Sequence, residues 1–157
     1  MANVHKKDPI IVTENSGPFR EIFNQNKSVM LLIDPGTGKI LDANFAAQDF
    51  YGFKNLLNEN IADINLLPEQ EVLKLMNTAV TKNRNHFLFS HQLATGEIRD
   101  VEVYSTPLLF KEKRLLLSIV HDITQRKKAE KQTSFLSKST SKLIKLKTPE
   151  EVYRFTT

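Results

Sequence analysis

The stretch His86-Phe-Leu-Phe-Ser-His-Gln-Leu93 decides the fold, because its apolar and polar residues alternate with a period of two. Successive side chains of a strand point to opposite faces. One face of this strand carries Phe87, Phe89, His91 and Leu93. The turn residues Ala94-Thr-Gly96 follow, and residues 98–109 alternate again. The pattern therefore predicts two strands joined by a tight turn.

A third strand is indicated by Leu115-Leu-Leu-Ser-Ile-Val-His-Asp122, which is apolar on both faces, as in a central strand covered on both sides. Upstream, residues 28–43 contain two short apolar runs separated by a glycine-rich turn. Small helical segments are expected at 44–67, and a clearer helix opens at Pro68. We therefore predict an α+β domain with a five-stranded antiparallel sheet.

The chain divides into four segments by composition and pattern. Residues 1–16 are mostly polar and read as a flexible lead-in, and residues 17–123 form the folded domain. Residues 124–147 predict a charged helix that leaves the domain, whose apolar seam is too interrupted for a strong coiled coil. Residues 148–157 read as the start of a following domain.

Composition excludes several kinds of chemistry. Cysteine is absent, so disulfides, thiolate nucleophiles, cysteine-ligated zinc and cysteinyl-flavin photochemistry are excluded. The net charge of +4 lies largely near the C-terminus, where we favour the solvated face of a helix over a nucleic-acid site, because no aromatic platform accompanies it. No apolar run is long enough to cross a bilayer or to serve as a signal peptide, so we expect a cytoplasmic protein without membrane insertion.

No catalytic or metal site is expected. Ser90 and His91 are adjacent on a strand and point to opposite faces, so they cannot form a nucleophile–base pair. The segment Gly36-Thr-Gly38-Lys39 is followed by Ile40, where a phosphate-binding loop needs Ser or Thr, so a hairpin turn is the better interpretation.

Four motifs in this order resemble the PAS domain family over roughly residues 18–130. They are Ile40-Leu-Asp-Ala-Asn-Phe-Ala-Ala47 with Tyr51-Gly-Phe53, Thr95-Gly-Glu97, Ser105-Thr-Pro-Leu108, and Val120-His-Asp-Ile-Thr-Gln-Arg-Lys127. The resemblance implies small helices folded over one face of the sheet to enclose a cavity, and a signalling helix that begins at the Asp-Ile-Thr motif.

The resemblance also implies which residues would contact a ligand. The expected contacts are Asn44, Phe50, Phe53, Met76, Phe87, Phe89, His91, Val103, Ser105 and Val120, and further lining is expected from Phe45, Ile64, Leu73, Val101 and Ser118. Asn44 can also cap the helix that follows it. For each apolar member plain core packing is the competing interpretation, and for His91 it is a ring satisfied by a neighbour or by water.

The resemblance leaves the cofactor unknown. Haem is disfavoured because the helix at 68–82 contains no histidine, and flavin is disfavoured because Val101 and Val120 stand where light-sensing members carry amides. A small uncharged or weakly acidic metabolite, or no ligand, is expected instead.

The predicted function is a non-catalytic sensory module of a larger signalling protein, such as a histidine kinase or a cyclic-dinucleotide regulator in a two-component or related system. Signal relay is expected from Asp122, Thr124 and Arg126, either by an Asp122–Arg126 ion pair or by ordinary helix capping.

A homodimer through the helices at 18–26 and 124–146 is expected. The tail at 136–152 resembles the lead-in to a GAF domain. The alternative is a ligand-free PAS domain that only mediates dimerisation or protein contacts.

Overall fold

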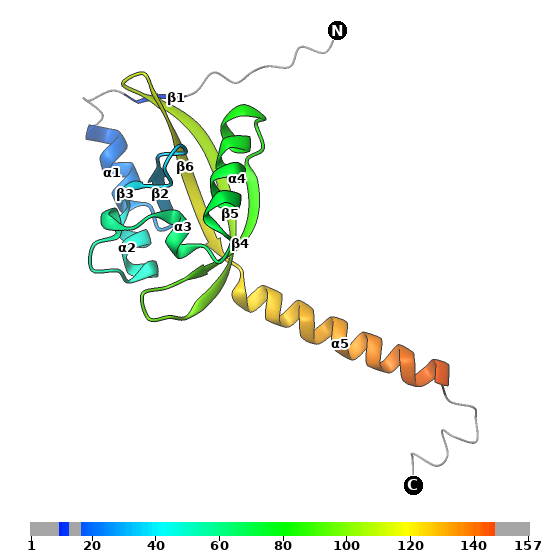
Figure 1. Cartoon of the computed structure of the whole chain (residues 1–157). Helices are drawn as coiled ribbons and strands as arrows, with labels where there is room; N and C mark the ends of the chain where they lie inside the picture. Colours follow the sequence, from blue (N-terminus) through cyan, green and yellow to red (C-terminus); the bar gives the residue numbers. More distant parts are fainter. Residues whose placement is uncertain (1–9, 13–16, 147–157) are drawn as a thin grey trace. The chain divides into compact units, whose positions relative to one another are not determined.

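The computed structural model describes residues 10–12 and 17–146, which form one mixed sheet, small helices and a long final helix (Figure 1). The elements in chain order are β1 Ile10–Val12, α1 Gly17–Gln25, β2 Val29–Ile33, β3 Ile40–Ala43, α2 Phe45–Tyr51, η1 Leu56–Asn58, α3 Ile61–Ile64, α4 Glu69–Thr81, β4 His86–Gln92, β5 Ile98–Phe110, β6 Lys113–Asp122 and α5 Thr124–Leu146. The α+β class predicted from the sequence is confirmed.

The predicted five-stranded antiparallel sheet is present in strands β2 to β6. The antiparallel ladder runs β3-β2-β6-β5-β4. The sequence did not predict β1, whose residues Ile10–Val12 lay in the expected lead-in but pair in parallel with the end of β5. They can do so because β5 runs on to Phe110, whereas β4 pairs only with its first seven residues, Ile98 to Tyr104.

The main hydrophobic core lies between one side of the sheet and helices α2 to α4. Helix α4 places Val72, Met76 and Ala79 inward, at the spacing that puts side chains on one helical face. Across from them, the sheet contributes Phe87 and Val103. The helices thus cover one face of the sheet, as the resemblance implied.

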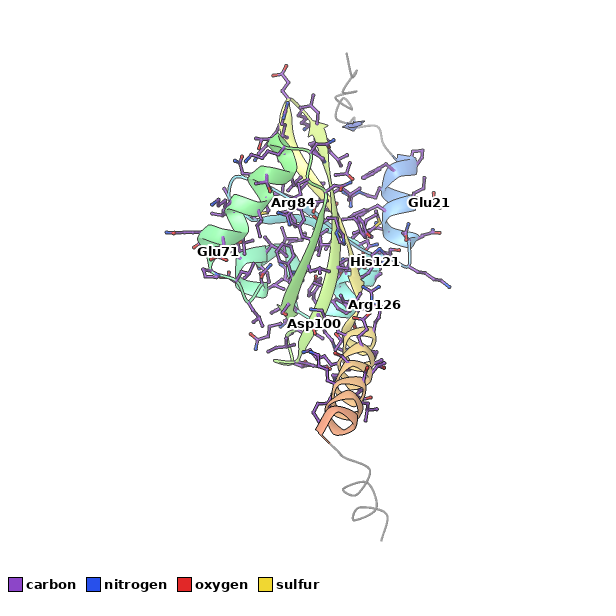
Figure 2. The ribbon with its side chains drawn as sticks, turned by 90° about the vertical axis from the view of Figure 1, so that its right-hand side faces the viewer. Glu21, Glu71, Arg84, Asp100, His121 and Arg126 are labelled. Atoms are coloured by element: carbon purple, nitrogen blue, oxygen red, sulfur yellow. The ribbon has the colours of Figure 1, made fainter. Side chains whose placement is uncertain are left out.

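The opposite side of the sheet carries a second, smaller set of buried residues. Leu108 and Leu115 face each other across β5 and β6 and alternate away from the main core, yet they are 2% and 3% exposed. Figure 2 shows α1 and α4 on opposite sides of the sheet, with Glu21 on one and Glu71 on the other. The α1 residue Phe23 is buried and stacks on Phe19, so α1 lies on an apolar surface, as its pattern predicted.

The glycine-rich segment between β2 and β3 is a hairpin turn. The backbone N–H groups of Thr37 and Gly38 donate to the Asp34 carbonyl, and the Asp34 side chain accepts from the Gly36 N–H. Gly38 has a φ of 77°, which suits glycine because it has no Cβ. The interpretation as a turn is confirmed.

The chain divides into two units after Ile123. Helix α5 is the described part of the second unit and has 23 residues, among which Lys and Ser are the most frequent. In the part of the chain that the structure describes, no helix combines the length and apolar character needed to span a bilayer. The segment 148–157, expected to open a further domain, lies outside the described residues.

Candidate functional site

A small cavity lies in the main core between the sheet and helices α3 and α4. Its lining comprises Leu31, Ile33, Ile61, Asn65, Val72, Met76, Ala79, Phe87, Phe89, His91, Val103, Ser105, Ser118 and Val120. Its volume is about 30 Å³. A water molecule needs roughly 10–15 Å³ measured in this way, so the cavity has room for about two or three water-sized groups.

His91 is the one ionisable side chain among the residues that line the cavity. It is 2% exposed, and burial lowers its pKa from 6.5 to about 4, so the ring is neutral near pH 7. Its Nδ1 lies 2.9 Å from the hydroxyl of Tyr51, at the end of α2. Its Nε2 is buried and has no hydrogen-bond partner among the described residues. One edge of this ring is therefore satisfied and the other is not.

Two serines and an asparagine supply the other polar groups of the lining. Ser105 on β5 and Ser118 on β6 are directly opposite each other, and their hydroxyl oxygens are 2.8 Å apart. Asn65 follows α3, pairs its backbone with that of His91 as an isolated bridge, and accepts from the Leu67 N–H through its side-chain oxygen. These groups lie in a mostly apolar lining, which is the usual composition of a small-molecule site.

The structure brings seven of the ten expected ligand contacts to the cavity. They are Met76, Phe87, Phe89, His91, Val103, Ser105 and Val120. Ser118 also lines it, whereas Val101 and Ile64 are buried in the surrounding core and Leu73 packs against that core. Whether any of the seven binds a ligand stays a prediction.

Three of the expected contacts lie elsewhere. Phe50 and Phe53 pack against the core from the α2 side without lining the cavity, and Phe50 meets the Tyr51 ring edge-on at 4.9 Å. Phe45, expected in the lining, is 59% exposed. The reason is the phase of α2, since Ala47 and Tyr51 are its inward residues and Phe45 at its first position points away from them.

Asn44 is the third, and its bonding explains its position. Its Oδ1 accepts from the N–H groups of Met30 and Ala47, and its Nδ2 donates to the carbonyls of Asn26 and Ser28. The cap of α2 that the sequence predicted is therefore present. With four hydrogen bonds made, this amide has nothing left to offer a ligand and instead ties α2 to the start of β2.

Sequence reasoning missed Tyr51 as the partner of His91 and Asn65 as part of the lining. Tyr51 and His91 are 40 residues apart along the chain, so no local pattern pairs them. An Asn directly after a short helical segment signals a turn, which is the local role that Asn65 plays towards Leu67. Its proximity to β4 has no local signature in the sequence.

At the end of the sheet the structure gives Asp122 a partner that the sequence did not suggest. Asp122 ends β6, and its Oδ2 lies 3.0 Å from Nη1 of Arg99 on β5. Arg99 also lies 2.9 Å from Glu97, and its pKa is raised, first by the hydrogen bond to Glu97. Helix α5 begins at Thr124, and Arg126 lies 3.8 Å from Glu130 one turn later. The Asp122–Arg126 pair and the helix cap stay predictions.

Among the described residues no group of three or more histidine or acidic side chains is arranged to hold a metal ion.

Similarity to known proteins agrees with this architecture. The sequence profile of the PAS domain family matches residues 26–125. The diguanylate cyclase DgcM of Escherichia coli K12 is 36% identical over 124 residues, which are 76% of this chain and 30% of that protein. This chain therefore spans less than a third of the length of that relative.

Solved structures share the fold at lower identity. The PAS domain of an HTR-like protein from Haloarcula marismortui has a TM-score of 0.62 at 19% identity, covering 70% of this chain and 93% of that one. A PAS domain from a two-component sensor histidine kinase has a TM-score of 0.54 at 19% identity, covering 66% and 92%.

Proposed function

Because this chain belongs to the PAS domain family, we propose that it is the non-catalytic sensory segment of a larger cytoplasmic signalling protein. The observation that carries the proposal is the cavity whose lining includes His91, a ring with its Nε2 buried and without a hydrogen-bond partner among the described residues. A ligand shifts a protein between states only when it binds one state better, and a buried polar group without a partner gives an occupant a contact to gain or lose.

The size of the cavity limits which ligand could serve as the signal that this domain senses. Pockets for drug-sized ligands occupy several hundred Å³, whereas this one measures about 30 Å³. A flavin or haem would have to displace core side chains such as Met76 and Phe89. We therefore propose a very small ligand or a protein contact as the input.

The output belongs to the rest of the parent protein. Similarity to a diguanylate cyclase over 30% of its length supports a parent that makes or regulates a cyclic dinucleotide, and a histidine kinase is the second candidate. The relay would pass from β6 through Asp122 into the helix that begins at Thr124. The resemblance of residues 136–152 to a GAF lead-in makes a further sensory domain part of this proposal.

The competing function is a ligand-free domain that mediates dimerisation. Two observations favour it: the small cavity, and the exposed apolar residues of two helices. Ile22 of α1 is 67% exposed, and Phe135 and Leu136 of α5 are 69% and 64% exposed. A homodimer through these two helices is compatible with either function.

A chimaera tests the sensory function directly. Residues 17–146 replace the matching segment of the E. coli diguanylate cyclase, and cyclase activity is measured for the chimaera and two variants. Val103→Ile adds one methylene group to the cavity lining, and Thr106→Ile adds apolar volume on the opposite face of the same strand. We expect Val103→Ile to change the activity at least twofold and Thr106→Ile to leave it unchanged.

Equal activity of all three proteins, with the fold of each verified by circular dichroism, would count against a role for the cavity in signalling. Mass spectrometry of material released from the purified chain separates the two functions further. A specific small molecule near one equivalent per chain supports the sensor, and its absence supports the dimerisation module.

A further inference from the structure

The bond between Tyr51 and His91 favours one of the two ring nitrogens as the carrier of the proton. Burial raises the pKa of the Tyr51 hydroxyl above its usual range, so this group keeps its proton. The hydroxyl oxygen lies 2.9 Å from Nδ1 of His91. If the hydroxyl donates its proton in this bond, Nδ1 is the acceptor. A neutral imidazole with an accepting Nδ1 carries its own proton on Nε2. With the hydroxyl as the donor of this bond, Nε2 is a buried donor.

The cavity lining supplies no acceptor for this donor. Nε2 has no partner among the described residues, and such an unsatisfied buried group costs free energy that an occupant of the cavity would recover. His91 lines the cavity together with the Ser105–Ser118 pair, in which one hydroxyl donates to the other and leaves the second proton available. The site thus offers two donors to whatever enters it.

The charge of the lining residues and the volume of the cavity restrict which molecules can bind in it. No Lys, Arg, Asp or Glu is among the lining residues, so a buried ion would have no fixed counter-charge there. The volume of about 30 Å³ admits no more than about three water-sized groups. An anion is disfavoured by the first fact and a flavin, haem or sugar by the second.

We propose that the cavity binds a small uncharged molecule with an oxygen atom that accepts hydrogen bonds. The molecule has no more than about three non-hydrogen atoms, and the Nε2–H of His91 and the serine pair donate to its oxygen. Water and a small carbonyl compound or alcohol share this chemistry. The inference rests on the proposed sensory function for its biological meaning. The experiments below measure the His91 ring and its occupant rather than signalling. Their outcome is therefore independent of the result of the chimaera experiment.

The first measurement needs no variant. Long-range ¹H–¹⁵N spectra of the full ¹⁵N-labelled chain at pH 7 report the tautomer of each histidine ring. We expect His91 to be a single neutral tautomer protonated at Nε2, and Tyr51→Phe to release that preference, because Nδ1 then loses its donor. A wild-type ring protonated at Nδ1 would overturn the proposal.

The second measurement identifies the occupant with two probes of matched size, formamide and formate. Formamide should shift the His91 Hε2 resonance with saturation, at a concentration at least tenfold below that at which formate acts. The exposed ring of His121 is the internal control and should respond to neither. A nuclear Overhauser effect from Hε2 to water, with no response to formamide, assigns the acceptor as water and also supports the proposal. Tighter binding of formate would overturn it.

Discussion

Asn44 and His91 are buried polar residues of the same domain whose bonding differs in kind. Asn44 makes four hydrogen bonds within the chain, whereas His91 makes one through Nδ1 and leaves Nε2 without a described partner. A buried polar group that is fully bonded stabilises one structure, and a partly bonded one remains able to respond to an occupant. The first residue is structural, and the second is the candidate for sensing.

His91 should make the stability of the domain depend on pH. Its pKa is about 4 in the folded chain and 6.5 when burial is lost. Between these values the unfolded chain binds more protons, so the free energy of unfolding falls as the pH drops from 6.5 to 4. A shift of this size corresponds to about 3 kcal/mol. Urea unfolding at several pH values measures the loss.

His91→Gln should remove most of that loss, whatever its effect on stability at pH 7, because glutamine does not titrate. The matched control is His121→Gln, which changes an exposed histidine of β6 (Figure 2) and should retain the wild-type pH dependence. Identical slopes for wild type and His91→Gln would show that the ring is not the titrating group.

Asn44→Ala should destabilise the domain by about 3 kcal/mol, since it removes a helix cap and leaves buried backbone groups of β2 and of the preceding turn unsatisfied. Asn55→Ala is the control, because Asn55 is exposed and makes one capping bond of 3.3 Å to the Leu57 N–H. It should cost less than about 1 kcal/mol. Chemical denaturation compares the two, and equal losses would contradict the structural role of Asn44.

At the scale of elements, the strands could be predicted from sequence more completely than the contacts between them. The alternation in 86–93 and 98–109 is a local property, so it placed β4 and β5 and put Phe87, Phe89 and His91 on the inner face. Strand β1 has three residues, too few for a period to be detected. The Tyr51–His91 bond joins an α2 residue to a strand residue, and no local pattern encodes such a pairing.

Strand β5 connects the cavity to the end of the sheet. Val103 and Ser105 line the cavity, and Arg99 pairs directly with His91 on β4 while its guanidinium reaches Asp122 on β6. The next residue, Ile123, donates its N–H to the Asp100 carbonyl at 2.8 Å. The last backbone bond before the helix is thus flanked by the Arg99–Asp122 ion pair.

Arg99→Gln should loosen that bond, because Asp122 loses the guanidinium beside it. We expect amide hydrogen exchange at Ile123 to accelerate about threefold, which is a small effect because partly exposed ion pairs are weak. Arg20→Gln breaks the comparable Arg20–Asp42 pair and should leave exchange at Ile123 unchanged. Equal exchange rates in wild type and Arg99→Gln would remove Arg99 from any role at this end of the sheet.

At the scale of the whole molecule, the two units differ in what stabilises each of them internally. The described residues up to Ile123 are organised around a buried core with a small cavity, whereas α5 carries exposed Phe135 and Leu136 on a helix rich in charge. A single long helix of this composition gains little from its own propensity and depends on packing against something else. A second copy of the chain is the partner we propose, and it would also cover Ile22 of α1.

This assignment predicts the effect of charge at the proposed interface. Ile22→Lys and Leu136→Lys each place an ammonium group where an apolar side chain is now 67% and 64% exposed, and burying that charge in a dimer is costly. We expect each to raise the dimer dissociation constant at least tenfold in light scattering over a concentration series. Gln25→Lys and Gln132→Lys add the same charge on the same helices without removing apolar surface, and they should change it much less. A wild-type chain that stays monomeric throughout, or control variants that dissociate as readily as the apolar ones, would exclude these helices as the interface.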